Sequence, residues 1–274
     1  EVGTLWIGGP LSWMEQLCLK SFVDKGQKIT LFSYEDIPNV PDGVIRRDGR
    51  EIIDTDDFIK YEQKNSFALF ADWFRLHMIH QNPGMIWIDM SSAKPEQARA
   101  QSVHLAEIGV AHLDAPVSGG TKGAQAASLA IMVGGDVASF ESMRSVFEAM
   151  GRPVHVGPSG AGQLCKLANQ TIVAVTIAAV AEATLLAEKG GADPAALRAA
   201  LKGGFADSVI LQQHGERMSE GNFTPGGMSK LQLKDLDNTL AEAGTLGLQL
   251  PTAQAVRDRF EYFIDEMHMG LSEM

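Results

Sequence analysis

The sequence has little of what marks secreted, nucleic-acid-binding or membrane-spanning proteins. Its 274 residues include only two cysteines, Cys18 and Cys165, so no disulfide framework is expected and a reducing, cytoplasmic environment fits. The formal net charge of −11 argues against a nucleic-acid partner, because phosphate binding requires clustered cations. The longest uncharged run near a helix, residues 167–181, is too short and too polar to span a bilayer, so no membrane partner is expected.

Tryptophan and alanine are scarce in opposite parts of the chain. All four tryptophans lie before residue 90, whereas residues 1–90 hold only two alanines and residues 91–274 hold 30. A boundary between two domains accounts for such a shift, and so does a fusion of two unrelated sequences.

The apolar periodicity divides the chain into an α/β part and a helical part. Strand and helix patterns alternate up to residue 157. Only helical patterns follow, beginning with a long helix over residues 162–189 that two glycines close. We therefore predict an α/β Rossmann-like N-terminal region over residues 1–157, followed by an all-α C-terminal domain over residues 158–274.

The opening of the chain lacks the glycine pattern of dinucleotide-binding folds. A strand over residues 4–8, a helix capped by Ser12 and Glu15, and a second strand form a predicted βαβ unit. Its turn, residues 8–13, reads Gly-Gly-Pro-Leu-Ser-Trp instead of Gly-x-Gly-x-x-Gly, with tryptophan where close packing needs glycine. Glu35 follows the second strand, where such folds often keep the acid that binds the ribose. An ordinary α/β turn is favoured over a nucleotide site.

Residues 71–91 carry another pattern. Ala-Asp-Trp-Phe-Arg on a predicted helix is followed by the strand Met-Ile-Trp-Ile-Asp, which ends at Asp89. Residues 2–89 thereby resemble the sugar-nucleotide region of bacterial capsular-polysaccharide-type glycosyltransferases. That family ends this strand in Asp-x-Asp, whose carboxylates hold a divalent metal, whereas this chain has Ser91 at the second acidic position. The resemblance implies a glycosyltransferase-like segment with half of the metal clamp missing.

Two histidines on the same predicted helix do not make a convincing metal site. His77 and His80 lie three residues apart and could share a face. Zinc needs at least a third protein ligand, and the neighbouring positions on that face offer none. We predict no metal site.

Two motifs after residue 90 carry candidate chemistry. A Ser-Gly-Gly turn at residues 118–120 follows a predicted strand, and paired glycines let backbone N–H groups approach an anion. Lys166 lies one turn inside the long helix, with Asn169 and Gln170 on the same face, an arrangement suited to proton transfer to a carbonyl oxygen. Taken singly, the motifs also fit a plain tight turn and a lysine that extends to solvent.

The order of these motifs resembles the 3-hydroxyisobutyrate dehydrogenase family over residues 88–274. The Ser-Gly-Gly turn precedes Gly-x-Gly-x-x-x-Lys-x-x-Asn, with Asp-Met-Ser-Ser-x-x-Pro at residues 89–95 before them and Leu-Lys-Asp-Leu at residues 233–236 after them. The stretches 166–170 and 203–208 look most like the tartronate semialdehyde reductase branch.

The resemblance implies an NAD(P)-dependent oxidoreductase that reduces a small 3-oxo acid such as tartronate semialdehyde, which is 2-hydroxy-3-oxopropionate. NAD or NADP would be the cofactor, a small 3-hydroxy or 3-oxo acid the substrate, and a homo-oligomer would form through the helical domain. Lys166 would be the catalytic acid. The other implied roles are binding of the substrate by Ser118, Gly119, Gly120, Asn169 and Gln170, and binding of the cofactor by Lys234.

The two resemblances meet at residues 88–90 and predict a hybrid chain. Residues 1–89 would be glycosyltransferase-like, residues 90–157 dehydrogenase-like, and residues 158–274 a helical dehydrogenase domain. The missing glycine pattern predicts impaired cofactor binding. The alternatives are a glycosyltransferase-like protein fused to a helical domain, and an inactive hybrid.

Overall fold

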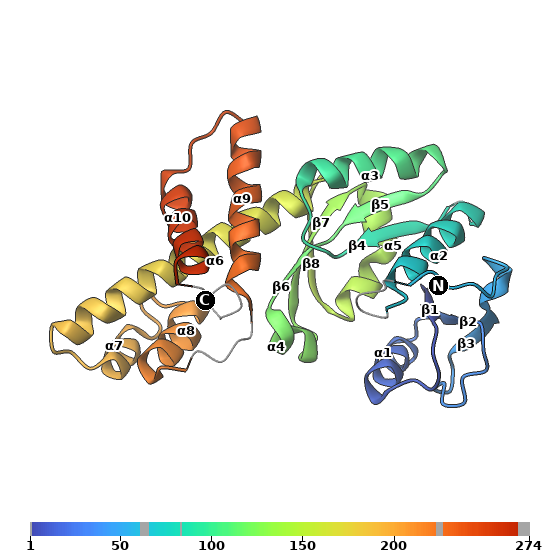
Figure 1. Cartoon of the computed structure of the whole chain (residues 1–274), viewed down its shortest axis with the longest axis horizontal. Helices are drawn as coiled ribbons and strands as arrows, with labels where there is room; N and C mark the ends of the chain where they lie inside the picture. Colours follow the sequence, from blue (N-terminus) through green and yellow to red (C-terminus); the bar gives the residue numbers. More distant parts are fainter. Residues whose placement is uncertain (1, 61–65, 83, 223–226, 268–274) are drawn as a thin grey trace. The chain divides into compact units, whose positions relative to one another are not determined.

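The computed structural model describes residues 2–60, 66–82, 84–222 and 227–267 (Figure 1). The chain forms two compact units. The first consists of Glu1–Ser91 and Glu96–Gly162, and the second of Ser92–Pro95 and Gln163–Met274. Each unit is described by itself below.

The first unit opens with a three-stranded parallel sheet in the order β1-β2-β3. The predicted βαβ opening and the capping box of Ser12 and Glu15 are confirmed, whereas β3 was not predicted. Leu31 of β2 packs in one cluster with Leu19 of α1, and the next residue, Phe32, packs with Phe74 of α2. Because neighbouring side chains of a strand point to opposite faces, α1 and α2 cover opposite faces of this sheet. The elements are β1 (Val2–Trp6), α1 (Trp13–Asp24), β2 (Ile29–Ser33), β3 (Ile45–Asp48), the short 3-10 helix η1 (Gly49–Glu51) and α2 (Ala68–Gln81).

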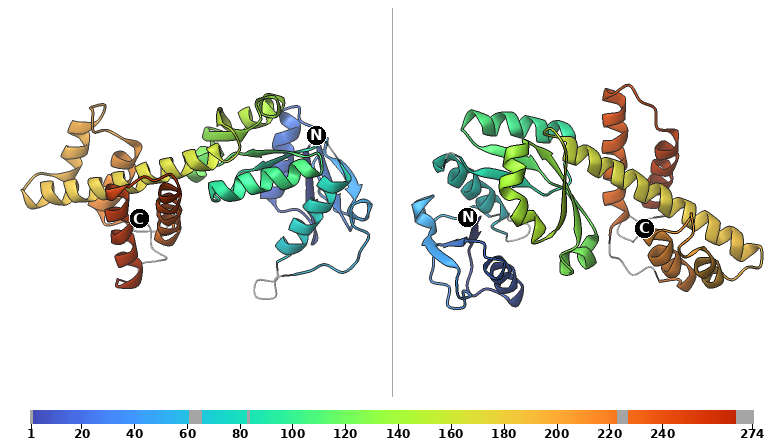
Figure 2. Two further views of the ribbon diagram at one scale, coloured as in Figure 1. Left: turned by 90° about the horizontal axis from the view of Figure 1, so that it is seen from above. Right: turned by 180° about the vertical axis from the view of Figure 1, so that it is seen from behind.

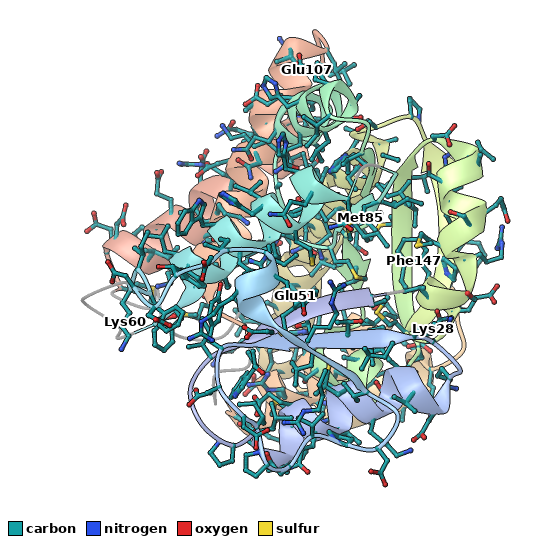
Figure 3. All side chains as sticks on the ribbon, turned by 90° about the vertical axis from the view of Figure 1, so that its right-hand side faces the viewer. Lys28, Glu51, Lys60, Met85, Glu107 and Phe147 are labelled. Atoms are coloured by element: carbon teal, nitrogen blue, oxygen red, sulfur yellow. The ribbon has the colours of Figure 1, made fainter. Side chains whose placement is uncertain are left out.

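A second, mixed sheet of five strands completes the first unit. Its order is β4-β5-β7-β6, and β8 also pairs with β7. β4 is parallel to β5 and β7 to β8, whereas β7 runs antiparallel to both β5 and β6. Phe140 and Phe147 of α5 are fully buried in the core of this sheet, and Phe147 is labelled in Figure 3. The elements are β4 (Ile86–Asp89), α3 (Pro95–Glu107), β5 (Ala111–Asp114), β6 (Val117–Ser118), α4 (Gly120–Gln125), β7 (Leu129–Gly135), α5 (Val137–Glu148) and β8 (Gly151–Gly157).

Every element that the structure describes after β8 is a helix, as the sequence predicts. Figure 2 shows α7 and α8, and likewise α9 and α10, packed as pairs along the long helix α6. Ala174 of α6 shares a core with Leu236 of α9 and with Val256 and Phe260 of α10. The helices are α6 (Ala161–Lys189), α7 (Pro194–Leu201), α8 (Val209–Glu220), α9 (Ser229–Thr245) and α10 (Pro251–Asp265).

Helix α6 is longer than its uncharged stretch and, by length and composition alone, could cross a membrane. The core helix of a globular helical domain meets the same two criteria. Ala174 packs against α9 and α10, and Lys166 and Gln170 make the polar contacts described below, so this part of α6 is held within the helical unit.

Candidate functional site

The Ser-Gly-Gly turn lies in the first unit, at the junction of β6 and α4. The sequence places this turn after the strand that became β5; the structure instead inserts the short strand β6, which contains Ser118. Gly119 has φ 137° and precedes α4, which begins at Gly120 without a side-chain cap. Both glycines are exposed, and a Cβ built on Gly120 would meet nothing within 4 Å. The backbone of this turn is therefore open to an approaching anion.

The glycines around residue 160 are required by packing and do not form a phosphate turn. Asp114 is fully buried at the end of β5, and its Oδ1 accepts a hydrogen bond from the Gly160 backbone N–H at 2.8 Å. A Cβ on Gly162 would lie 2.3 Å from the carbonyl oxygen of Asp114. The backbone at Gly162 is therefore already covered by another strand, which leaves no room for a phosphate.

Lys166 is half-buried on α6, in the second unit. Its Nζ donates a hydrogen bond to Gln170 Oε1 at 3.0 Å. Burial lowers the pKa of Lys166 below that of an ordinary lysine, Asp235 opposes this shift, and Lys234 adds to it. A lysine that gives up its proton more readily than usual suits general acid–base chemistry.

Asn169 and Gln170 lie beside Lys166 and are bonded to each other. Asn169 Nδ2 donates to Gln170 Oε1 at 2.9 Å, so this oxygen accepts from both neighbours. Gln170 Nε2 donates to Asp235 Oδ2 at 2.8 Å and to Gln232 Oε1 at 3.3 Å, both on α9. The predicted group on α6 is thus tied to the helix that carries Lys234.

Lys234 lies at the surface end of this network. Its Nζ is 3.0 Å from Asp235 Oδ1 and donates to the carbonyl oxygen of Ser92 at 3.4 Å. Ser92 Oγ also donates to Asp235 Oδ1, at 3.3 Å. The second unit therefore brings Lys166, Asn169, Gln170 and Lys234 into one connected polar cluster.

Sequence reasoning missed three members of this cluster: Ser92, Gln232 and Asp235. Asp235 stands inside the Leu-Lys-Asp-Leu stretch, and Ser92 inside Asp-Met-Ser-Ser. Both stretches were noted as motifs, but without a role for these residues. Gln232 belongs to no motif, and only its hydrogen bond to Gln170, between α9 and α6, identifies it as a member of the cluster.

The turn after β1 already holds an anion from its own chain. The backbone N–H groups of Gly8 and Gly9 both donate to Glu35 Oε1, at 2.9 and 3.0 Å. Ser12 and Glu15 cap the start of the following helix α1. The side chain of Trp13, the first residue of α1, is 71% exposed. The turn is occupied by a carboxylate.

The metal-binding features expected of a glycosyltransferase stay incomplete in the structure. Asp89 Oδ1 accepts the backbone N–H of Ser91 at 2.9 Å, an arrangement that closes a local turn. His77 Nδ1 lies 3.1 Å from the carbonyl oxygen of Trp73 on its own helix. Within the described ranges, no three His, Cys, Asp or Glu side chains are grouped so as to hold a metal ion.

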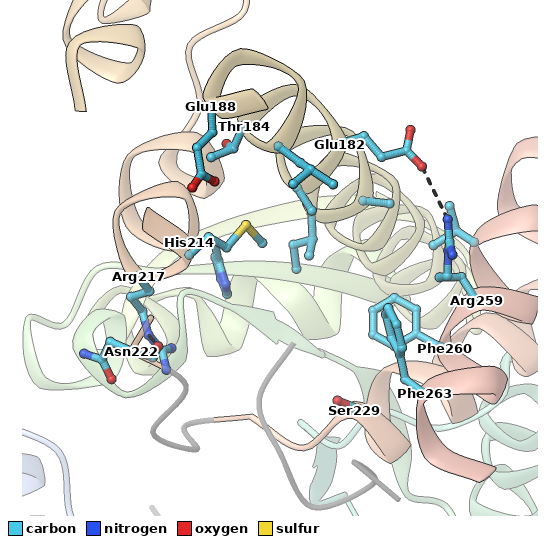
Figure 4. Close-up of a pocket in the computed structure, with 16 residues that line it drawn as sticks. Glu182, Thr184, Glu188, His214, Arg217, Asn222, Ser229, Arg259, Phe260 and Phe263 are labelled. Atoms are coloured by element: carbon cyan, nitrogen blue, oxygen red, sulfur yellow. Dashed lines mark hydrogen bonds and ion pairs between the residues drawn. The ribbon is translucent and has the colours of Figure 1, made fainter. Parts of the chain in front are cut away.

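Two cavities lie apart from these groups. One of about 510 Å³, within the helical unit, is lined by apolar and polar residues, most of them on α6, α8 and α10, and includes the ion pair of Glu182 and Arg259 at 3.7 Å (Figure 4). Another, of about 310 Å³, lies in the first unit beside Glu51 and Met85. The predicted site residues do not line either cavity.

Two family models match consecutive parts of the chain. Residues 76–159 match the NAD-binding domain of 6-phosphogluconate dehydrogenase. Residues 160–272 match the model described as NAD-binding of NADP-dependent 3-hydroxyisobutyrate dehydrogenase. From residue 76 to residue 272, the chain is similar to 3-hydroxyacid dehydrogenases.

Curated relatives point the same way. The chain is 48% identical to 2-hydroxy-3-oxopropionate reductase of Escherichia coli over 178 residues, which are 65% of this chain and 61% of that protein. It is 34% identical to 3-hydroxyisobutyrate dehydrogenase of Pseudomonas aeruginosa over 194 residues, 67% of this chain and 65% of that one. The chain thus matches less than two thirds of the length of these relatives.

Solved structures resemble almost the whole chain in fold. The 3-hydroxyisobutyrate dehydrogenase of Mycobacterium tuberculosis with L-serine is 26% identical, with a TM-score of 0.72 over 98% of this chain and 96% of that one. The 3-hydroxyisobutyrate dehydrogenase of Salmonella typhimurium, 21% identical, covers 100% and 97% with a TM-score of 0.72. The predicted fold class, a Rossmann-like α/β region followed by a helical domain, is confirmed. These matches lend no support to the glycosyltransferase interpretation of residues 2–89.

Proposed function

We propose that the chain is an NAD(P)-dependent 3-hydroxyacid dehydrogenase that reduces a small 3-oxo acid such as 2-hydroxy-3-oxopropionate. The observation that carries this proposal is the half-buried Lys166, held by Gln170 in a network that reaches Asp235 and Lys234. The 48% identity to a 2-hydroxy-3-oxopropionate reductase supports the choice of substrate.

Lys166 acts as the general acid in this proposal. In the direction of reduction its ammonium donates a proton to the carbonyl oxygen of the substrate as negative charge develops there. In the direction of oxidation the neutral amine accepts the proton of the hydroxyl group. The pKa of Lys166, lowered by burial, makes the proton easier to release in reduction and leaves a larger neutral fraction of the amine for oxidation.

The remaining predicted residues bind and orient the substrate. Ser118, Gly119 and Gly120 bind its carboxylate, for which the open backbone of the turn is suited. Asn169 and Gln170 orient the substrate beside the lysine. This role is compatible with their side-chain amides, which can donate and accept but do not ionise usefully.

NADH or NADPH would supply the hydride for reduction, and NAD or NADP would accept it in oxidation. The Gly8-Gly9 turn fits such a cofactor in part, because two of its N–H groups already converge on one anionic oxygen, that of Glu35. The Glu35 carboxylate there stands in for a phosphate oxygen. A phosphate reaches this position only when Glu35 leaves it, so we expect weak binding at this turn. Lys234 is the residue of the second unit that we assign to the cofactor.

We also propose a cytoplasmic homo-oligomer that assembles through the helical domain. Three large apolar side chains of α6, Ile172, Leu185 and Leu186, are 66%, 55% and 77% exposed in the single chain. Exposed apolar surface on a helical domain favours association with a second copy. Light scattering of the wild type and of Leu186→Asp tests this, and an unchanged monomeric mass in both would contradict it.

The activity is tested by following oxidation of NADH and of NADPH with 2-hydroxy-3-oxopropionate and with related small 3-oxo acids. Lys166→Ala is compared with Lys189→Ala, which removes an exposed lysine from the last turn of the same helix. We expect turnover in the wild type and in Lys189→Ala and its loss in Lys166→Ala. Absence of turnover in the wild type with every acid and both cofactors would refute the proposed function.

A further inference from the structure

Two lysines of the helical unit, Lys166 and Lys234, are connected to one buried carboxylate, that of Asp235. Only 5% of this residue is exposed. Its Oδ1 contacts Lys234 Nζ and the hydroxyl of Ser92, and its Oδ2 accepts from Gln170 Nε2. A buried carboxylate stays ionised only where donors such as these replace water. Asp235 is thus bonded to Lys234 directly and to Lys166 through a single amide.

The contacts of that amide fix its orientation. Gln170 Nε2 lies between two acceptors, Asp235 Oδ2 and Gln232 Oε1. Gln232 is held in turn, because its own Nε2 donates to the main-chain oxygen of Gln170 at 3.0 Å. With the Nε2 end held by acceptors, Gln170 Oε1 must face the donors Lys166 Nζ and Asn169 Nδ2. Reversing the amide would place donors against donors at one end and acceptors against acceptors at the other.

We propose that Asp235 is a positioning residue that holds Lys166 in place through Gln170 and holds Lys234 directly. Its negative charge polarises the Gln170 amide and strengthens the acceptor that the Lys166 ammonium uses. The catalytic consequence rests on the proposed function, whereas the effect of Asp235 on the Lys166 amine does not.

Asp235→Asn and Asp237→Asn form a matched pair for the first test. Both substitutions remove one negative charge from α9, but Asp237 is exposed and pairs with Arg257 at the surface. We expect Asp235→Asn to lower kcat in reduction by roughly ten- to hundredfold, the size of effect that misplacement of a reacting group produces. Asp237→Asn should keep kcat within about twofold, because exposed ion pairs contribute little. Equal loss in both variants would overturn the proposal.

A pair of compensating substitutions separates positioning from a general loss of structure. Gln170→Asn shortens the bridge by one methylene, and Asp235→Glu lengthens the carboxylate by one. Each change alone alters the length of the hydrogen-bonded connection from Lys166 through residue 170 to residue 235. The two changes together restore that length. We expect each single variant to lose kcat by about tenfold or more and the double variant to regain most of it, a coupling typical of residues in one network. A double variant that stays folded by circular dichroism yet shows the summed losses would overturn the proposal.

A third readout needs no catalytic activity. Only the neutral amine of Lys166 reacts with acetic anhydride, so the rate of its acetylation against pH, read by peptide mass spectrometry, reports its protonation. The charged groups that act on Lys166 are Asp235, which favours its ammonium form, and Lys234, which opposes it. We expect the acetylation midpoint to move to lower pH in Asp235→Asn and to stay in place in Asp237→Asn.

The acetylation result also separates this inference from the proposed function. A wild type without reductase activity refutes the function, and the acetylation midpoint still tests the role of Asp235. An unchanged midpoint in a folded Asp235→Asn would overturn the inference. If Asp235→Asn does not fold, the acetylation midpoint of the double variant decides: a return to the wild-type value supports the inference, and any other value contradicts it.

Discussion

Two glycine turns of the first unit look alike in sequence and differ in what occupies them. Gly8-Gly9 follows β1 and precedes α1. Gly119 follows β6, and Gly120 is the first residue of α4; the φ angles of all four glycines are positive. The first turn donates two N–H groups to Glu35 and leads into a helix with a complete capping box. The second leads into a helix without a side-chain cap.

The difference shows that a glycine turn alone does not define an anion site. A glycine turn can bind an external anion only if no side chain of the protein already accepts hydrogen bonds from its N–H groups. At the first turn that side chain is Glu35, which lies more than twenty residues away in the sequence. The comparison favours the second turn for the substrate carboxylate of the proposed reaction, because a cofactor phosphate at the first turn would have to compete with Glu35.

The largest effect is expected from Lys166, which the proposed reaction needs in addition to the second turn. Lys166→Ala should lower kcat by roughly 10²–10⁴-fold, as expected for loss of a positioned general acid. Lys166→Arg should fail almost as badly, because a guanidinium does not release its proton near neutral pH. Steady-state kinetics and circular dichroism are measured on the same samples. Activity retained within about threefold in a folded Lys166→Ala would remove Lys166 from the mechanism.

The pH dependence should show the same lysine. Reduction requires the ammonium form of Lys166, so kcat should fall by about tenfold per pH unit above its pKa. Because burial lowers this pKa, the fall should begin at a lower pH than for an ordinary lysine. Oxidation requires the neutral amine and should rise over the same range. Profiles in both directions check this, and two profiles that rise together would be inconsistent with it.

The comparison of the turns is sharpened by one substitution in each. Gly120 has φ 60° and Gly9 has φ 68°, and a Cβ on either meets nothing within 4 Å. Alanine at either position should therefore cost a similar roughly 1–2 kcal/mol of stability, from the left-handed backbone alone. Only Gly120→Ala should raise KM for the acid substrate, by roughly tenfold for a weakened hydrogen bond to a carboxylate. Equal KM values in the two variants would show that the two turns do not differ in binding the substrate carboxylate.

Glu35 offers a way to make the first turn resemble the second. Glu35→Gln removes the charge from the carboxylate that the turn binds, while the side chain keeps nearly the same shape. NADH binding should be weaker than micromolar in the wild type and tighter by roughly two- to fivefold in the variant, the usual size of a charge effect at a surface turn. Titration of cofactor fluorescence measures both. Micromolar affinity in the wild type would show that Glu35 does not compete.

The smallest effect is expected in a test for glycosyltransferase activity of residues 2–89. With Ser91 in the place of an acid, a bound diphosphate lacks one charged metal ligand. Incubation with UDP-sugars and manganese should give neither transfer nor hydrolysis. Metal-dependent release of UDP would show that Asp89 alone can hold the metal, and would support the glycosyltransferase interpretation of residues 2–89.

The sequence predicted those helices and strands whose apolar pattern or capping residues lie within the element itself. The long helix was predicted over residues 162–189 and observed as Ala161–Lys189, and the start of α1 was predicted from Ser12 and Glu15. The short strand β6 was missed, because two residues give no period to detect. β3 was missed since its residues are exposed and carry no apolar alternation.

The candidate site was predictable only as far as its residues lie close in the chain. Lys166, Asn169 and Gln170 share one helical face, and that follows from spacing. Asp235 lies 65 residues from Gln170, so its contact depends on how α9 packs on α6, which no local pattern reveals. The occupation of the Gly8-Gly9 turn by Glu35 was missed for the same reason.

The close approach of backbone segments around Asp114 also constrains how this protein can change over evolutionary time. A Cβ on Gly134 would lie 2.7 Å from the backbone nitrogen of Gly162, and one on Gly151 only 2.1 Å from the carbonyl oxygen of Leu129. At these positions any other amino acid requires a simultaneous shift of a neighbouring backbone segment. A single substitution there is therefore not tolerated. Descendants of this sequence should vary freely at open glycines without a positive φ, such as Gly244, and keep Gly134, Gly151 and Gly162 longest, and a randomised library selected for folding should show the same order.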